Sequence, residues 1–250
     1  MTGEVLQDDP HRRVVRIGDT VRRPMHPWSP TIHEILQHLE KTGFEYAPRV
    51  LGIDEEGREV LTWLDGESGG DAWAKVVTDE GLVAMARLLR DYHDAIRGFR
   101  PTAMAGWAAH DGVFGAGELI GHGDFGPWNL VWHCNRPVGI LDWDYALPAR
   151  PVFDVAYALE YVTPFRDDDF AVRSLRYPGP PQRRRRLELF ASAYGLTSID
   201  GLVGKVRAQQ REVLARARRL ATEGHQPQVS WQESGALDEV ARRITQPINL

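Results

Sequence analysis

The sequence predicts an α+β fold, in which a small, mostly β N-terminal lobe precedes a larger helical C-terminal lobe. Short strand-like segments separated by turns fill the first sixty or so residues, whereas apolar residues recur at helical spacing from about residue 71 onwards. A chain of 250 residues is long enough for two lobes that share a cleft. We therefore expect one lobe over residues 1–64 and the other over residues 65–250.

The predicted N-terminal lobe contains several strands and one helix. Turn residues at 18–19 and 54–57 separate pairs of strand-like segments. Ser29 and Pro30 predict the start of a helix, because serine caps helices and proline is favoured in the first turn. An apolar stripe over residues 32–39 supports that helix. The strands are expected at residues 12–17, 20–23, 50–53 and 59–63.

The predicted C-terminal lobe follows a linker at Thr62–Gly70. Apolar residues at helical spacing over residues 82–89 predict a helix that ends near Arg97. Apolar runs on both sides of a turn at Cys134–Pro137 predict a hairpin over residues 130–141. Further helices are expected near residues 154–162, 183–195, 199–223 and 232–246.

The pattern with the clearest chemical meaning lies at the start of this hairpin and just beyond its end. Asp124 precedes Asn129 by five residues, and Asp142 follows Asn129 by thirteen. Kinase catalytic loops use this order, with one Asp for the attacking hydroxyl and with Asn and a second Asp for Mg²⁺. A hairpin brings its ends together, so Asn129 and Asp142 should lie side by side. The motif therefore predicts Mg²⁺-dependent phosphoryl transfer.

His122-Gly123-Asp124 stands where protein kinases have His-Arg-Asp. With this motif the chain resembles the aminoglycoside phosphotransferase family, small-molecule kinases that share the protein-kinase fold. The resemblance implies transfer of the γ-phosphate of ATP or GTP to a hydroxyl group. The acceptor would be a small molecule, such as an aminoglycoside-like antibiotic or a hydroxylated metabolite. It also implies a catalytic role for Asp124 and support of the loop by His122.

The resemblance extends through residues 151–157. In the family, the Asp of this stretch begins a helix and braces the catalytic loop, so Asp154 is expected to be structural. A plain helix-capping role would explain Asp154 equally well. Asp144 is expected to assist either the metal or the loop.

The resemblance places adenine against backbone groups of Thr62, Trp63 and Leu64. A cation for the phosphates is expected from Arg22 or Arg23, in place of the lysine of kinases. Because side chains alternate along a strand, Arg23 shares a face with Val21, as the corresponding kinase residues do. We therefore favour Arg23, and an exposed arginine on an edge strand is the alternative.

The remaining walls of the nucleotide site are less typical. The helical acid that pairs with this cation would be Glu34, with His33 almost as well placed. The loop that covers the phosphates should fall at Gln7–His11, which has two acids and no glycine. Without glycine the backbone approaches phosphate less closely. A catalytically degenerate, nucleotide-binding kinase-like module is therefore the alternative to an active enzyme.

Acidic residues of the C-terminal lobe are candidates for acceptor binding. Family members that phosphorylate aminoglycosides line the acceptor site with carboxylates, because these substrates are polycations. By resemblance, Glu160 and the run Asp167, Asp168 and Asp169 would have this role. The alternative is that the run is a solvated loop surface.

A serine hydrolase is the rival from another enzyme class. Residues 66–70 fit the Gly-x-Ser-x-Gly pattern after a strand, which would make Ser68 a nucleophile with His225 as a distant base. The following segment is a weak helix start, and short Gly-rich patterns arise easily in linkers. We therefore rank this hypothesis below phosphoryl transfer.

Composition narrows the class of protein. A net charge of −5 argues against general nucleic-acid binding, which depends on excess Lys and Arg. No apolar run reaches the length of a membrane span, and the N-terminus lacks a signal-peptide pattern. Cys134, the one cysteine, excludes an internal disulfide. We expect a cytoplasmic enzyme with a nucleoside triphosphate and a small molecule as partners, and no nucleic acid or membrane.

Overall fold

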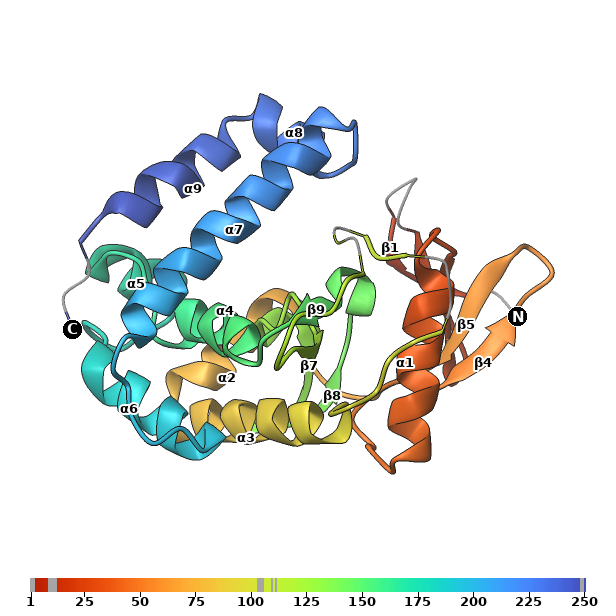
Figure 1. The fold of residues 1–250 in the computed structure, drawn as a ribbon, viewed down its shortest axis with the longest axis horizontal. Coiled ribbons are helices and arrows are strands. Elements are labelled where there is room, and N and C mark those ends of the chain that lie inside the picture. The colour runs from red at the N-terminus through yellow and green to blue at the C-terminus, as the bar shows by residue number, and fades with distance from the viewer. Residues whose placement is uncertain (1–2, 9–12, 103–105, 109, 111, 248–249) are drawn as a thin grey trace.

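The computed structural model describes residues 3–8, 13–102, 106–108, 110, 112–247 and 250. An antiparallel sheet and one helix form the N-terminal part, and helices dominate the rest (Figure 1). The sheet lies at one end of the elongated molecule, while the C-terminal helices lie at the other end. The α+β arrangement of the chain is therefore as the sequence predicts.

The N-terminal sheet is antiparallel, with the strand order β1-β2-β3-β5-β4. Its centre is β3, which pairs with β2 on one side and with β5 on the other. In this register Arg23 lies opposite Glu59, and Arg22 lies opposite Val60. Alternation along β3 sends the two arginines to opposite faces of the sheet. The strands are β1 (Glu4–Gln7), β2 (Val14–Ile17), β3 (Thr20–Pro24), β4 (Val50–Ile53) and β5 (Arg58–Thr62).

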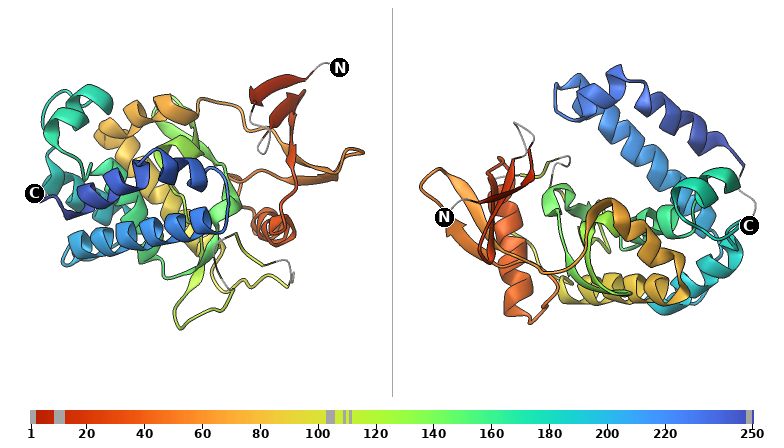
Figure 2. Two further views of the ribbon diagram at one scale, coloured as in Figure 1. Left: turned by 90° about the horizontal axis from the view of Figure 1, so that it is seen from above. Right: turned by 180° about the vertical axis from the view of Figure 1, so that it is seen from behind.

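Helix α1 (Ser29–Lys41) stands beside the sheet, between it and the rest of the molecule (Figure 2). The predicted apolar stripe, from Ile32 to Leu39, is buried in the core. The helix begins differently from the expectation, because Trp28 occupies the N-cap position. The hydroxyl of Ser29 instead accepts a hydrogen bond from the backbone N–H of His26 at 2.9 Å.

The long helix α3 (Asp79–Ala95) is the centre of the C-terminal part. Its apolar face is fully buried and packs against α6 (Arg183–Tyr194). Helices α4 (Val152–Val162) and α7 (Leu202–Thr222) contact each other, and α7 also contacts α8 (Gln228–Glu233) and α9 (Ala236–Thr245). The shorter elements are η1 (Gly69–Ala72), α2 (Trp73–Val77), η2 (Pro127–Asn129), η3 (Trp143–Tyr145) and α5 (Asp168–Ser174).

The predicted hairpin is present as β7 (Leu130–His133) and β8 (Arg136–Ile140). Its turn is shorter than expected, because Arg136 already pairs with His133. Cys134 adopts a positive φ of 54° within this tight turn. A second pair, β6 (Leu119–Gly121) with β9 (Leu147–Ala149), was not predicted. It places the segment after Gly121 directly beside the segment that follows Asp142.

None of the helices in the described part of the chain combines the length and the apolar character needed to cross a lipid bilayer.

Candidate active site

The loop that carries His122-Gly123-Asp124 follows β6 and is fixed by hydrogen bonds to Asp154 of α4. The buried Asp154 carboxylate accepts hydrogen bonds from the backbone N–H groups of His122 at 2.7 Å and of Gly123 at 2.9 Å. His93 on α3 is 3.1 Å from the same carboxylate. These bonds lower the pKa of Asp154 against the opposing effect of its burial. Asp154 therefore fixes two consecutive backbone groups of the loop, which is more than a helix cap would do.

Gly123 meets a steric requirement at this point of the loop. Its φ is +80°, and a Cβ atom at this position would lie 2.0 Å from the carbonyl oxygen of Tyr145. A residue with a side chain would be both strained and in collision. The close approach of this loop to the segment after Asp142 therefore depends on glycine.

The buried side chain of His122 connects the loop to the end of the hairpin. Its Nε2 lies 2.9 Å from the carbonyl oxygen of Leu141, and its Nδ1 accepts from the backbone N–H of Asp124 at 3.3 Å. Together these contacts define the neutral ring with the proton on Nε2. Burial lowers the pKa of His122, in agreement with a neutral ring. The ring also packs edge-on against Trp143.

Asp124 is the acid that the loop presents. Its Oδ1 accepts a very short hydrogen bond from the hydroxyl of Tyr157 on α4, and its Oδ2 accepts from Nδ2 of Asn129 at 2.8 Å. Burial raises the pKa of Asp124 to about 6, and the charge of Asp142 acts in the same direction. The bonds from Tyr157 and Asn129 oppose this shift. At neutral pH the side chain is thus mostly a carboxylate with a substantial affinity for a proton.

Asn129 and Asp142 lie next to each other at the open end of the hairpin. The backbone N–H of Leu141 donates to the carbonyl oxygen of Asn129 at 2.7 Å, so the ends of the hairpin are tied together. Nδ2 of Asn129 also donates to the backbone oxygen of Asp124 at 2.9 Å. This fixes the amide with its oxygen directed away from Asp124. Asp142 adopts a left-handed conformation, with φ at 55°.

A magnesium ion fits this pair of side chains. Amide and carboxylate oxygens are hard ligands, and Mg²⁺ is commonly held by one or two carboxylates together with substrate phosphates. Within the described residues, no group of three or more His, Cys, Asp or Glu side chains lies close enough to hold a metal. Asn129 and Asp142 would therefore hold the ion jointly with a nucleotide.

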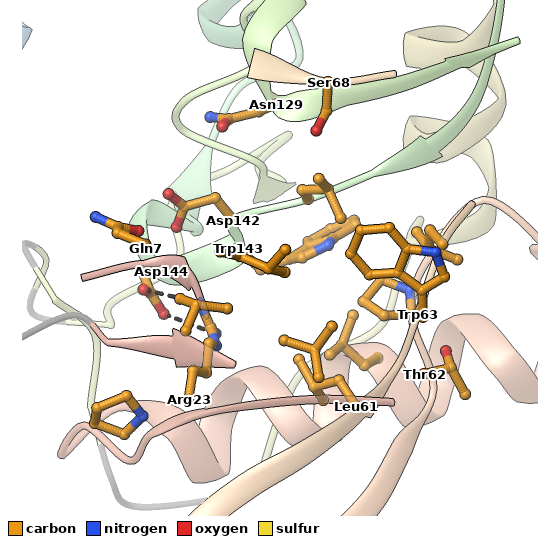
Figure 3. Close-up of a pocket in the computed structure, with 18 of the residues that line it drawn as sticks. Gln7, Arg23, Leu61, Thr62, Trp63, Ser68, Asn129, Asp142, Trp143 and Asp144 are labelled. Atoms are coloured by element: carbon orange, nitrogen blue, oxygen red, sulfur yellow. Dashed lines mark hydrogen bonds and ion pairs between the residues drawn. The ribbon is translucent and has the colours of Figure 1, made fainter. Parts of the chain in front are cut away.

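Arg23 connects the sheet to the segment after Asp142. Its Nη1 and Nη2 lie 3.2 and 3.1 Å from the carboxylate oxygens of Asp144 (Figure 3). Its Nε lies 2.5 Å from Glu59. Burial opposes the charge on Arg23, but Asp144, Glu59 and Asp142 outweigh it and raise the pKa of the guanidinium. Asp144 therefore holds the guanidinium of Arg23 in place and stabilises its positive charge.

The acidic partner of Arg23 comes from β5 and not from the helix. Glu59 is fully buried and contacts His33 at 2.6 Å as well as Arg23. Glu34, the partner expected from the sequence, instead binds the backbone N–H of Thr102 at 2.6 Å on the surface. The expectation for Glu34 is therefore wrong, and His33 reaches the cation only through Glu59.

Arg22 lies on the opposite face of β3. Its Nη1 donates to the hydroxyl of Thr20, and its Nε lies 3.9 Å from Asp54. Arg22 does not line the cleft that contains Arg23. Of the two candidate cations, the structure brings only Arg23 to the Asn129–Asp142 pair.

A cleft of about 410 Å³ separates the sheet from the hairpin (Figure 3). One end is apolar, and the other end contains Arg23, Asn129 and Asp142. Apolar walls beside a cationic and metal-binding end suit a nucleotide, with its base and its phosphates at opposite ends. The apolar lining consists of Leu6, Val14, Val21, Pro24, Leu36, Pro48, Leu61, Trp63, Leu64, Leu141 and Trp143.

The linker residues expected to bind adenine all line this cleft. Two of their backbone donors are already engaged. The N–H of Thr62 donates to Arg49 at 3.0 Å, and that of Trp63 donates to Asp19 at 2.9 Å. Of the three expected residues, Leu64 is therefore the one whose N–H suits a purine acceptor.

The expected phosphate-covering loop lies partly outside the described residues, because positions 9–11 are not among them. Gln7, at its start, is described and lines the cleft near Asp142 (Figure 3). A polar amide thus stands at the position from which the loop would approach the phosphates.

A second cavity, of about 620 Å³, opens on the other side of the Asn129–Asp142 pair. It is lined by Asp124, by Tyr157 and Glu160 of α4, and by residues of α7 and α9. Gln7, Asn129 and Asp142 line both cavities, whereas Asp124 faces the second cavity only. We refer to the two as the nucleotide cleft and the acceptor cavity.

The acidic run at the start of α5 lies elsewhere. Asp167 caps this helix by accepting from the backbone N–H of Phe170 at 2.7 Å, and Asp168 pairs with Arg183 at 2.7 Å. Asp169 lies 3.7 Å from Arg173 on the surface. None of the three lines the acceptor cavity, so the structure favours their role in the helix.

The hydrolase hypothesis gains no geometric support. Ser68 lines the nucleotide cleft, whereas His225 lines a separate pocket and lies 3.7 Å from Glu223. The serine precedes a short 3₁₀ helix, not the long helix that follows a nucleophile elbow. The structure therefore does not assemble a triad around Ser68.

Several residues of the site were not found from the sequence. Tyr157 is the one of these residues that the sequence could most easily have predicted, because it lies one helical turn after Asp154 and thus near the same loop. Gln210 and Arg243 gave no local signal, since they reach the acceptor cavity through the packing of α7 and α9.

This fold and the two adjoining cavities define a small-molecule phosphotransferase of the protein-kinase-like type. The sequence signature of the phosphotransferase enzyme family (APH) matches residues 105–190. A trifolitoxin immunity protein from Rhizobium leguminosarum bv. trifolii is 36% identical in an alignment of 189 residues, which covers 74% of this chain and 70% of that protein. The chain belongs to the phosphotransferase enzyme family, and it is an enzyme that transfers a phosphoryl group to a hydroxyl group.

Solved structures confirm the protein-kinase-like fold. The GDP and kanamycin complex of APH(2")-IIIa aligns with a TM-score of 0.58 and 16% identity, over 96% of this chain and 93% of that one. A choline/ethanolamine kinase family protein from Mesorhizobium loti aligns with a TM-score of 0.61 and 13% identity, over 99% and 89%. At such low identity these relatives establish the fold and not the acceptor.

Proposed function

We propose that this protein transfers the γ-phosphate of ATP or GTP to a hydroxyl of a small molecule bound in the acceptor cavity. The observation that carries this proposal is the arrangement of the two cavities. They meet at Asn129 and Asp142, while Asp124 faces the acceptor side alone. A phosphate held at the shared wall would be within reach of a hydroxyl held at Asp124.

Asp124 is the proposed proton acceptor. As the bond between the γ-phosphorus and the acceptor oxygen forms, the bond to the bridging oxygen of the nucleoside diphosphate breaks. The hydroxyl proton passes to the carboxylate of Asp124. A pKa of about 6 suits this role, because the group is ionised at pH 7 yet binds a proton readily. Tyr157 and Asn129 hold the carboxylate in one orientation.

Mg²⁺, held by Asn129 and Asp142, would neutralise the phosphate charge. Arg23 is the protein cation that lines the same end of the nucleotide cleft, and Asp144 and Glu59 hold its guanidinium in place. Asp154 and His122 position the loop that carries Asp124. Together these residues assign a function to each member of the predicted motif.

The relatives support an antibacterial compound as one kind of acceptor. One relative is named an immunity protein for trifolitoxin, and one structural neighbour is solved with kanamycin. Phosphorylation of a hydroxyl would change the charge and shape of such a compound and so reduce its activity. Consumption of a nucleoside triphosphate also supports the cytoplasm as the site of action.

A direct test is phosphoryl transfer from ATP and from GTP, with Mg²⁺, to a panel of hydroxylated compounds that includes kanamycin. Asp124→Ala should lower the transfer rate by about 10²–10⁴-fold, the usual range for loss of a general base. Binding of the Mg²⁺–nucleotide complex should be retained. Asp169→Ala, on the surface of α5, is the matched control and should keep full activity.

Three results would contradict the proposal. Full activity of Asp124→Ala would remove the assigned proton acceptor. Nucleotide binding without turnover of any acceptor would favour a catalytically degenerate binding module. Ester cleavage lost in Ser68→Ala would instead support the hydrolase.

A further inference from the structure

A polar cluster lies at the far end of the acceptor cavity, around Glu160. Tyr157 and Glu160 are three residues apart on α4, so they share a face and differ by about 4.5 Å along the helix axis. Tyr157 contacts Asp124, whereas Glu160 is surrounded by polar side chains from other segments. The cavity thus has a reaction end at Asp124 and a polar end at Glu160.

The polar end carries more positive than negative charge. Nη2 of Arg166 and Nη2 of Arg243 each lie 3.9 Å from one carboxylate oxygen of Glu160. Arg207 is held nearby, since its Nη1 donates to Oε1 of Gln210 at 3.0 Å. Three guanidinium groups therefore surround one carboxylate. Burial also raises the pKa of Glu160, although Arg166, the neighbouring amide of Gln210 and Arg207 oppose the shift.

Two buried donors, on residues that line the cavity, lack a hydrogen-bond partner within 3.5 Å among the described residues. They are Nε2 of Gln210 and Nε of Arg243, and both residues line the acceptor cavity. Gln210 is only 3% exposed. Buried donors normally have acceptors, so these two groups are suited to an oxygen atom of a bound molecule.

The walls between the two ends are apolar and aromatic. Trp128 packs edge-on against Tyr161 at 4.6 Å between ring centres, and Trp231 is 43% exposed although it lines the cavity. Asp124, Asp142 and Glu160 are the acids of the lining. The first two lie at the reaction end, and the third lies beside Arg166 and Arg243, of which Arg243 lines the cavity. The aliphatic lining comes from Val213, Leu214, Ala217, Ala236, Leu237 and Val240.

We propose that the acceptor is a hydroxylated molecule with an apolar or aromatic body and a carboxylate at its far end. The hydroxyl lies at Asp124, the body contacts the aromatic walls, and the carboxylate accepts from Gln210 and Arg243. This inference rests on the proposed function, because it assumes that the cavity holds the acceptor. A polycation such as kanamycin would meet Arg243 at the polar end, with Arg166 and Arg207 behind it, and would be repelled.

Three probes with one shared body test the charge preference. They are 4-(hydroxymethyl)phenylacetate, its neutral primary amide and the cationic 4-(hydroxymethyl)phenethylamine. Binding is measured by tryptophan fluorescence, with Mg²⁺ and a non-hydrolysable nucleotide present, since Trp128 and Trp231 line the cavity. We expect the anion to bind at least about tenfold more tightly than the amide, and the cation most weakly, as charge-assisted hydrogen bonds require.

Variants of Arg243 test whether the preference for the anion arises at the polar end of the cavity. Arg243→Gln should remove most of the advantage of the anion over the amide, and Arg243→Lys should restore part of it. Arg242→Gln is the matched control, because this neighbouring arginine is exposed, pairs with Glu239 and does not line the cavity. Its affinities should equal those of the unmodified protein.

Tighter binding of the cation, or of kanamycin, than of the anion would overturn the inference. So would the absence of saturable binding of the anion, or a preference unchanged in Arg243→Gln. These readouts need no turnover, so they separate the two proposals. An inactive protein that binds the anion best contradicts the proposed function, whereas an active kinase that prefers the cation contradicts only the acceptor class.

Discussion

Arg23 and Asp144 are paired through both terminal nitrogens of the guanidinium, at 3.1 and 3.2 Å. The pair connects the centre of the N-terminal sheet to the segment two residues beyond Asp142. Because Nε of the same arginine contacts Glu59, one planar group holds two carboxylates at once. A lysine ammonium has no such fork. The arginine at this position therefore makes contacts with two carboxylates that the lysine of kinases could not make in the same geometry.

Removal of this cation should weaken nucleotide binding. Arg23→Met is expected to raise the KM for the nucleotide by about tenfold or more, since charge-assisted contacts to phosphate are strong. Arg23→Lys should be intermediate, because it keeps the charge and loses the fork. Initial-rate kinetics with varied nucleotide concentration measure both effects.

Arg22→Met is the control for these variants. Its side chain contacts Thr20 and Asp54 and does not line the nucleotide cleft. The KM for the nucleotide should therefore stay within about twofold of the original value, because this side chain lies on the face of the sheet opposite to Arg23. Equal effects of the Arg22 and Arg23 variants would contradict the assignment of Arg23.

Glu59 should be important for stability. It is fully buried and contacts both Arg23 and His33, so Glu59→Ala leaves a buried guanidinium without one of its two carboxylates. Loss of one partner of a buried ion pair typically costs about 3–5 kcal/mol of unfolding free energy. Urea denaturation measures the change, with Glu40→Ala as control.

Glu40 suits this control because its ion pair with Arg49, at 3.5 Å, is exposed on the surface. Such pairs contribute about 0–1 kcal/mol. A loss of stability in Glu59→Ala no greater than in Glu40→Ala would show that the buried carboxylate does not stabilise the sheet.

The elements predicted correctly are those whose signals are local. The stripe over residues 32–39 and the apolar runs on either side of the hairpin turn each describe one element by its own periodicity. The short pair β6–β9 has no such signal, because its two strands are three residues long and are separated by the whole catalytic segment. Proximity of these strands is a property of the folded lobe.

The site shows the same limit. The spacing of Asp124, Asn129 and Asp142 could be interpreted because one hairpin links these positions. Partners from distant segments could not be predicted, as Glu59 in place of Glu34 shows. Asp167 illustrates a local signal that was interpreted differently, since an acid before a helix is also a capping residue.

Gly123→Ala should disturb the catalytic loop by more than the backbone strain of an alanine at positive φ, because the added side chain also collides with a neighbouring group. The added Cβ would lie 2.0 Å from the carbonyl oxygen of Tyr145. Gly117→Ala is the matched control, because Gly117 has a similar φ of +75° and nothing within 4 Å of its Cβ position. The control should lose about 1 kcal/mol of stability from backbone strain.

Gly123→Ala should lose more stability than this control, together with most of the activity, because the loop must move away from the hairpin end. Thermal unfolding and turnover measure the two effects. Similar losses in both variants would show that the contact with Tyr145 is not important.

Asp142→Asn should increase the requirement for magnesium. The substitution keeps an oxygen at the metal site but removes its charge, and the charge is what draws Mg²⁺ to a carboxylate. Half-maximal activity should therefore need at least about tenfold more Mg²⁺, as for the loss of one charged ligand. A magnesium titration at saturating nucleotide is the measurement. An unchanged requirement would contradict the assignment of Asp142 as a metal ligand.

The pH profile of turnover should report the ionisation of Asp124. Because burial raises its pKa to about 6, turnover should rise as the pH increases through about 6 and then level off. The Tyr157 hydroxyl lowers this pKa through its hydrogen bond, so Tyr157→Phe should move the midpoint to higher pH. A midpoint that is unchanged in Tyr157→Phe would indicate that another group controls the profile.

The same ionisation should be visible in the stability of the protein without substrates. The pKa of Asp124 is higher in the folded protein than the ordinary value of 3.8, so the native state binds this proton more tightly than the unfolded state. The charge on Asp124 therefore reduces stability as the pH rises from about 4 to about 6. The difference between a pKa of 3.8 and one of about 6 corresponds to roughly 3 kcal/mol.

Asp124→Asn should remove this cost while it abolishes turnover. The melting temperature of Asp124→Asn, relative to that of the unmodified protein, should thus be higher at pH 7.5 than at pH 4. Asp169→Asn, on the exposed face of α5, should show no such difference. If the relative stability of Asp124→Asn is the same at both pH values, ionisation of the buried carboxylate does not destabilise the folded protein. The pKa of Asp124 would then not be raised in the protein without substrates, and another feature would have to explain how Asp124 accepts the proton.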